Sequence, residues 1–157
     1  PLLRGRDFSE SDAAGAPGVA IVNETMARQF WPNGDAVGQS FEIPGTGDLL
    51  RRLHTRYPLY LLSDTNEIHF GYVKQTVAVI RLFDQCIVSY EVGAMKPEPR
   101  IYQEALRRSG LPADACVFID DRPGNVEGAR RVGMHAFQFV SPEQCAAELT
   151  RIGVVIP

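Results

Sequence analysis

The sequence predicts an α/β fold with a mainly parallel sheet covered by helices on both faces. After residue 48, short apolar runs typical of buried strands alternate with helical patterns. Polar residues directly follow two of these runs. Strands that alternate with helices favour parallel pairing, and ligands of such sheets bind beyond the carboxyl ends of the strands. We therefore expect a binding site at that edge of the sheet.

A change in composition near residue 48 predicts two domains. Residues 1–48 carry three Arg and seven Asp or Glu, whereas residues 49–157 carry thirteen basic and twelve acidic residues. The run Pro44-Gly45-Thr46-Gly47-Asp48 lies at the boundary and is typical of a turn or linker. We expect an N-terminal fragment over 1–48 and a core domain over 49–157.

The elements of the core domain follow one another in a regular order. Its first helix has Leu49, Leu50 and Leu53 at helical spacing, with Asp48 as the N-cap. A later helix has Pro99 at its start and Gly110 just past its end. The predicted strands are 59–62, 86–88, 116–119 and 135–140, and the predicted helices are 49–57, 73–83, 99–109, 125–132 and 142–151.

Composition excludes several classes of function. The chain has 157 residues and a net charge of -3, so it offers no basic field for a nucleic acid. No apolar run reaches the roughly 18 residues of a membrane span, and residues 1–6 contain no apolar core of a signal peptide. Cys86, Cys116 and Cys145 are odd in number and widely spaced, which argues against disulfides and Cys-x-x-Cys zinc sites. We expect a cytoplasmic protein without nucleic-acid or membrane partners.

The turn Ser63-Asp64-Thr65-Asn66 is the first candidate for a functional cluster. It follows the predicted strand 59–62. Hydroxyls and backbone amides at the start of such a turn can donate to phosphate oxygens, which predicts that Ser63, Thr65 and Asn66 bind phosphate. Taken alone, the same residues are also typical of a helix N-cap.

Two further clusters lie in later loops. Lys96 stands in Gly93-Ala94-Met95-Lys96-Pro97-Glu98-Pro99, where a lysine fixed in a defined loop can neutralise a phosphoryl group. Asp120 and Asp121 directly follow an apolar strand, and adjacent carboxylates repel each other unless a cation lies between them. Oxygen ligands suit Mg²⁺. The alternatives are a surface lysine and a capping aspartate.

Together, the three clusters resemble those of the haloacid dehalogenase-like superfamily, most closely its sugar-phosphate phosphatases. The resemblance covers about 49–157 and rests on Ser63-Asp64-Thr65-Asn66, Lys96-Pro97-Glu98-Pro99-Arg100-Ile101-Tyr102 and the stretch from Phe118 to Ala129. It implies a Rossmann-like core in which Ser63 binds phosphate and Lys96 steadies it. It also implies that Asp120 and Asp121 hold the metal.

One departure from the family changes the expected mechanism. These enzymes attack phosphorus with an aspartate of an Asp-x-Asp motif that follows the first, central strand, and no Asp-x-Asp occurs in this sequence. The resemblance therefore implies a truncated core that lacks the usual first strand and cap. Loss of the nucleophile of a concerted hydrolytic site costs on the order of 10⁶ in rate.

The N-terminal fragment resembles a different family. Gly5-Arg6-Asp7-Phe8, the stretch from Val19 to Pro32, and Val37-Gly38-Gln39-Ser40-Phe41 are similar to the extracytoplasmic domain of macrolide-exporter-type ABC permeases, over about 4–43. The chain is thus expected to be a chimeric fusion. A strand at 19–22 and a helix at 24–30 either complete the sheet or pack elsewhere.

The function expected from these residues is a metal-dependent phosphoester hydrolase that uses metal-activated water. Its partners are small phosphorylated substrates, diesters as well as monoesters, and a second copy of the chain, because unpaired strand edges favour a homodimer. Lys96, Ser63 and Asp120 are the expected catalytic residues. Mg²⁺ is the expected metal, with Mn²⁺ or Zn²⁺ as alternatives, and Asp64 and His69 are additional candidate ligands. The competing hypotheses are a non-catalytic phosphate- or metal-binding remnant and an interaction module.

Overall fold

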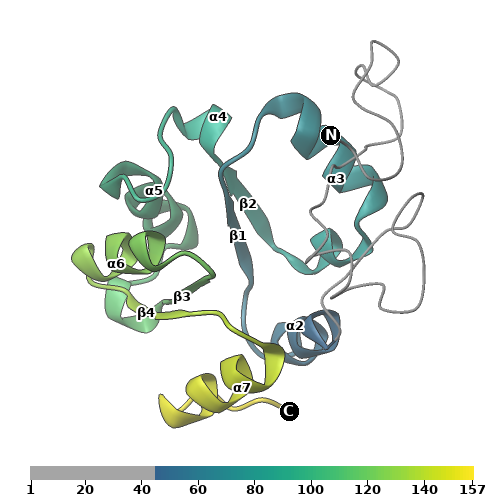
Figure 1. The fold of residues 1–157 in the computed structure, drawn as a ribbon, viewed down its shortest axis with the longest axis vertical. Helices are drawn as coiled ribbons and strands as arrows, with labels where there is room; N and C mark the ends of the chain where they lie inside the picture. The colour runs from purple at the N-terminus through teal and green to yellow at the C-terminus, as the bar shows by residue number, and fades with distance from the viewer. Residues whose placement is uncertain (1–44) are drawn as a thin grey trace, which may run out of the picture. The chain divides into compact units, whose positions relative to one another are not determined.

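The structure is a computed structural model that describes residues 45–157, so the predicted strand at 19–22 and helix at 24–30 lie outside it. The described part alternates helices and strands, as the sequence predicts (Figure 1). Its strands are β1 (Tyr60–Ser63), β2 (Gln85–Val88), β3 (Val117–Asp120) and β4 (His135–Gln138). Its helices are α2 (Thr46–His54), α3 (Glu67–Thr76), α4 (Ser89–Val92), α5 (Pro99–Ser109), α6 (Pro123–Arg131) and α7 (Pro142–Arg151), with 3₁₀ turns η2 (Ala78–Leu82) and η3 (Ala113–Ala115).

The four described strands form two parallel pairs. Strand β1 pairs with β2 in the register Leu62 to Ile87, and β3 pairs with β4 in the register Ile119 to Phe137. Within residues 45–157, β1 and β3 are not paired with each other, so each has one neighbouring strand (Figure 1). The α/β class with parallel strands is confirmed, and in the described residues no strand lies between the two pairs.

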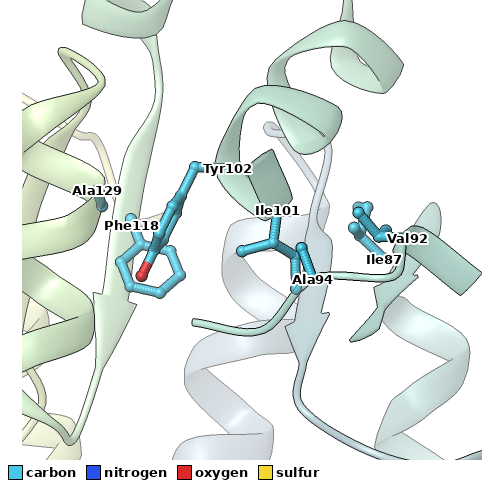
Figure 2. Packing of buried hydrophobic residues seen from close by; sticks show 7 residues of the cluster. All are labelled: Ile87, Val92, Ala94, Ile101, Tyr102, Phe118 and Ala129. Atoms are coloured by element: carbon cyan, nitrogen blue, oxygen red, sulfur yellow. The ribbon is translucent and has the colours of Figure 1, made fainter. Parts of the chain in front are cut away.

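Helices pack on both faces of the strands, as expected. On one face, the α4–α6 region contributes a buried cluster that contains Ile101 and Tyr102 of α5 together with Ile87 and Phe118 of the strands (Figure 2). On the other face, Leu49 and Leu53 of α2 and Leu149 of α7 form a second buried cluster with Phe137. Successive residues of a strand face opposite sides, which explains how Phe118 joins one cluster while its neighbours Val117 and Ile119 border the other.

The structure corrects the start of the first predicted helix after the linker. Thr46 to Asp48, predicted as part of a linker with Asp48 as an N-cap, already belong to α2. Gly45 takes the N-cap position with a φ of 84°, a conformation that glycine adopts without steric cost. Leu49 and Leu53 are buried against α7, because the amphipathic face of α2 meets that helix.

The predicted bounds of the helix at 73–83 are also wrong. Helix α3 begins at Glu67, because the Asn66 side chain accepts a hydrogen bond from the amide of His69 and caps the helix. The α-helix ends before Val77, and a 3₁₀ turn follows among β-branched residues that disfavour helix. By contrast, α5 and α7 match their predicted bounds.

The first strand is less enclosed than its apolar sequence predicts. Its residues Tyr60–Ser63 are half-buried rather than buried on both faces, because β1 has a paired strand on one side only in the described part of the chain. None of the helices in residues 45–157 has the length and apolar character needed to cross a membrane.

Candidate functional site

The side chain of Lys96 joins the two strand pairs at their carboxyl ends. Its Nζ donates to the backbone oxygen of Leu62, in β1, at 3.0 Å and to Oδ2 of Asp120, the last residue of β3, at 2.8 Å. The side chains of Lys96 and Asp120 are only 11% and 7% exposed. Ser63 ends β1 directly after Leu62. The structure therefore brings Lys96 and Asp120 into contact and places Ser63 next to the carbonyl that Lys96 binds.

Both carboxylate oxygens of Asp120 accept hydrogen bonds. Oδ2 accepts from Lys96, while Oδ1 accepts from the amide of Arg122 and from Nδ2 of Asn125, each at 2.9 Å. Burial alone favours the neutral acid, but these donors outweigh it and lower the pKa of Asp120 below its ordinary value. Asp120 is therefore a fixed anion at neutral pH.

The loop that carries Lys96 is held by two carboxylates. Oδ1 of Asp64 accepts from the backbone amide of Lys96 at 2.9 Å, and Oε1 of Glu98 accepts from the amide of Met95 at 2.9 Å. Gly93 starts the loop with a φ of 67°. Asp64 thus fixes the Lys96 backbone, whereas Asp120 fixes its ammonium group.

In the turn Ser63–Asn66 after β1, some hydrogen-bond donors already have partners in the described residues. The Ser63 hydroxyl has no hydrogen-bond partner among residues 45–157. The amide of Thr65 donates to Oγ of Ser89, a buried residue, so this amide is not free for an anion. Asn66 caps α3 through its side-chain oxygen. Ser63 is accordingly the best placed of the expected phosphate ligands, and the N-cap interpretation holds for Asn66.

A divalent cation does not fit the described donors as they are arranged. Asp120 is already neutralised by Lys96, and one oxygen of Asp64 is bound to the Lys96 amide. Asp121 and His69 are exposed. Residues 45–157 contain no group of three or more acidic, histidine or cysteine side chains that could hold a metal. The expected set of Asp120, Asp121, Asp64 and His69 is therefore not assembled, and Mg²⁺ binding stays a prediction.

Three residues without a predicted role support the site. Asn125 is 5% exposed and binds Asp120, and its backbone oxygen accepts from the hydroxyl of the fully buried Tyr102 at 2.8 Å. Ser89 holds the turn after β1. Asn125 and Tyr102 lie in stretches that the sequence singled out, but nothing in a sequence shows that they meet. Ser89 follows the end of β2, a strand-end position that could have signalled it.

The arrangement is suited to hold an anion. The partly buried ammonium group of Lys96 has three N–H donors, of which Leu62 and Asp120 take two. The Ser63 hydroxyl belongs to the residue that follows Leu62. A phosphoryl group at the carboxyl ends of β1 and β3 could accept from both side chains. Partly buried charges interact more strongly than they do in water.

Comparison with known proteins gives a family for the chain. The model of the haloacid dehalogenase-like hydrolases matches residues 10–133. The chain is 26% identical over 148 residues to flavin mononucleotide hydrolase 1 of Arabidopsis thaliana, an alignment that covers 85% of this chain and 59% of that protein. It is 32% identical over 105 residues to a glyceraldehyde 3-phosphate phosphatase of Pyrococcus abyssi, covering 62% of this chain and 42% of that protein.

A solved structure shows the same relationship. It is a haloacid dehalogenase family enzyme of Bacteroides thetaiotaomicron in complex with magnesium and inorganic phosphate, with 32% identity and a TM-score of 0.56. The match covers 60% of this chain and 50% of that one, so the chain spans about half the length of such relatives.

The family match begins at residue 10, inside the stretch 4–43 that resembles a permease, and these comparisons give no support to the permease resemblance. The family model, the parallel α/β fold of the described residues and the relatives all agree. The chain therefore belongs to the haloacid dehalogenase-like hydrolases.

Proposed function

We propose that the chain is a phosphoester hydrolase that acts on small phosphorylated substrates. The observation that carries this proposal is the mostly buried Lys96 ammonium, 11% exposed, fixed between Leu62 and Asp120 beside the end of β1. An ammonium group held at that position can bind a phosphoryl oxygen at little cost in side-chain entropy. The names of the relatives, a flavin mononucleotide hydrolase and a glyceraldehyde 3-phosphate phosphatase, support a phosphoester substrate.

In this proposal Lys96 and Ser63 bind and orient the phosphoryl group. Asp120 keeps the Lys96 side chain in place, and Asp64 keeps its backbone in place. No Asp-x-Asp occurs among the 157 residues, so water attacks phosphorus directly, the ester P–O bond breaks and the leaving oxygen takes up a proton. The predicted cation would be held by Asp120 and Asp121, but it does not fit the described donors, and we derive no step from it.

Single-turnover hydrolysis in ¹⁸O-labelled water tests the mechanism. The full chain is mixed in excess with 4-nitrophenyl phosphate or bis(4-nitrophenyl) phosphate, with added Mg²⁺, with Mn²⁺ or with a chelator. Direct attack by water puts the label into the phosphate product in the first turnover. A stable phosphoprotein with phosphate on Asp64 or Asp120 contradicts direct attack. Activity that survives the chelator unchanged contradicts the metal dependence expected from the sequence.

A second candidate function is phosphate binding without turnover. It is favoured by the Lys96–Asp120 ion pair, which neutralises an acidic group within the described site, and by the missing Asp-x-Asp motif. Phosphate-dependent stabilisation of the chain without release of 4-nitrophenol supports this candidate.

We also propose that the chain forms a homodimer. Strands β1 and β3 each have one paired neighbour in the described residues, and an unpaired strand edge can recruit a second chain. Leu49 and Leu53 of α2 are buried within the chain, so the proposal of a dimer rests on the strand edges.

A further inference from the structure

We propose that the side chains of Arg130 and Gln144 guard the outer edge of β4, so that the β4 strand of a second copy of the chain does not add to the sheet there. The inference concerns this edge alone. It holds or fails whether or not the chain hydrolyses a substrate, and whether or not a homodimer forms at β1 and β3.

The outer edge of β4 is the side that faces away from β3. The amides of His135 and Phe139 donate to backbone oxygens at the two ends of β3, at 3.0 and 2.9 Å, so these residues face β3. Backbone groups of successive residues in a strand point to opposite sides. The backbone groups of Ala136, Gln138 and Val140 therefore point outward, where residues 45–157 supply no further strand.

The outer edge is open to an approaching chain segment. A groove of about 400 Å³ is lined there by residues of β4, α6 and α7, among them Arg130 and Gln144. His135 and Gln138 are exposed, and Val140 is 72% exposed. Because a segment has room to approach, its exclusion must come from contacts at the edge itself.

Gln144 makes the two contacts that one residue of a parallel neighbouring strand would make. Its Nε2 donates to the backbone oxygen of Gln138 at 3.1 Å, and its Oε1 accepts from the amide of Val140 at 3.2 Å. In a parallel ladder, one residue likewise donates to an oxygen and accepts from the amide two positions further on. Gln144 lies in the first turn of α7, where its own amide donates to Oγ of the N-cap Ser141. Its side chain therefore fills a pairing position of the edge.

Arg130 covers the preceding outward carbonyl of β4. Its Nε and Nη2 both donate to the backbone oxygen of Ala136, at 3.1 and 2.8 Å. The Arg130 side chain is 53% exposed and its Nη1 lies 3.8 Å from Glu127, so the charge stays in contact with water. A strand added at this edge would have to displace or bury this charged group, and a second copy of β4 would bring a second one.

Three outward groups of β4 are thus engaged, namely the oxygens of Ala136 and Gln138 and the amide of Val140. An added strand needs these groups whether it runs parallel or antiparallel to β4. Pairing of two copies would break these contacts on both copies before new hydrogen bonds form. The edge is therefore closed to strand addition, although it is accessible to solvent.

Light scattering on two double variants of the full chain tests the guards. Arg130→Met/Gln144→Ala removes both, whereas Arg131→Met/Gln103→Ala makes the same substitutions at exposed positions of α6 and α5. At the highest concentration that stays in solution, we expect the first variant to show at least about twice the mass of the second, because an open strand edge recruits another chain. Equal masses of the two folded variants at every concentration overturn the proposal.

Hydrogen exchange of the Ala136 and Gln138 amides gives a measurement on the wild type, which does not depend on the folding of a variant. Both amides point to the outer edge, so pairing there would slow their exchange as the concentration rises. We expect rates that do not depend on concentration in the wild type, and rates that fall with concentration in Arg130→Met/Gln144→Ala. Protection that grows with concentration in the wild type shows that β4 pairs despite its guards and overturns the proposal.

Discussion

The phenol hydroxyl of Tyr102 donates a hydrogen bond of 2.8 Å to the backbone oxygen of Asn125, whose side chain binds Asp120. Tyr102 is fully buried in the cluster between α5 and β3, and its ring meets that of Phe118 edge to face at 5.3 Å (Figure 2). Burial, followed by the charges of Asp120 and Asp64, raises the pKa of Tyr102 to about 12. The hydroxyl therefore stays a donor at neutral and moderately alkaline pH.

We expect Tyr102→Phe to destabilise the fold by about 1–3 kcal/mol, because it leaves a buried carbonyl oxygen without its donor. The matched control is Tyr90→Phe, since Tyr90 is 39% exposed and its substitution should change the free energy of unfolding by less than about 0.5 kcal/mol. Urea denaturation measures both values. Equal stability of the two variants would show that the Tyr102 hydroxyl does not support α6.

Gly128 and Gly124 provide a matched pair in α6. A Cβ on Gly128 would lie 2.8 Å from the Tyr102 hydroxyl and 2.9 Å from Cβ of Pro97, whereas a Cβ on Gly124 meets nothing within 4 Å. Gly128→Ala should cost about 1–3 kcal/mol through overpacking, and Gly124→Ala should be neutral or stabilise by up to about 1 kcal/mol. Thermal unfolding of both variants tests this difference. A stable Gly128→Ala would contradict the packing of α5 against α6.

Asp120→Asn should destabilise the chain by about 1–3 kcal/mol at pH 7, because it leaves the partly buried Lys96 ammonium without its charged partner. Asp114→Asn is the control, since Asp114 is exposed. The folded-state pKa of Asp120 is lowered, because its hydrogen-bond donors outweigh burial, so the stabilising effect is present above the ordinary value of 3.8 and is lost as the pH falls through the folded value.

The loss of this stabilising effect at low pH is measured by the urea midpoints of the wild type and of Asp120→Asn, from pH 7 down to pH 2. The gap between the wild type and Asp120→Asn should narrow below pH 3.8. A gap that stays constant over this range would mean that Asp120 does not carry a charge-dependent contribution.

Light scattering tests the proposed homodimer. The full chain at micromolar concentration should show about twice its chain mass, because β1 and β3 each have an unpaired side in the described residues. A monomer that stays unchanged on dilution would contradict the dimer.

Local signals in the sequence predict most of the fold of residues 45–157. Pro99 and Gly110 bound α5 as expected, because a proline at the first helical position and a glycine past the last one act locally. The start of α3 is not predicted, because the apolar pattern indicates a helix only from residue 73, although Asn66 is a residue typical of an N-cap. The burial of Leu49 depends on α7, about a hundred residues later in the chain, and helical spacing alone does not identify the partner helix.

The sequence predicts which residues form the candidate site better than it predicts the contacts between them. The strand-end positions of Ser63 and Asp120 follow from the alternation of strands and helices. That Lys96 binds Asp120, and so takes the place expected for a cation, depends on where two loops meet in space. The use of the Thr65 amide by Ser89 has the same origin.

Turnover of bis(4-nitrophenyl) phosphate by purified full chain, Lys96→Met and Lys74→Met tests the proposed function most directly. We predict turnover by the wild type and by Lys74→Met, and a loss of at least about 10²-fold in a folded Lys96→Met, because an ammonium group that stabilises a phosphoryl transition state is worth several kcal/mol. No turnover by the wild type, or equal rates in the two lysine variants, would contradict a hydrolytic site built on Lys96.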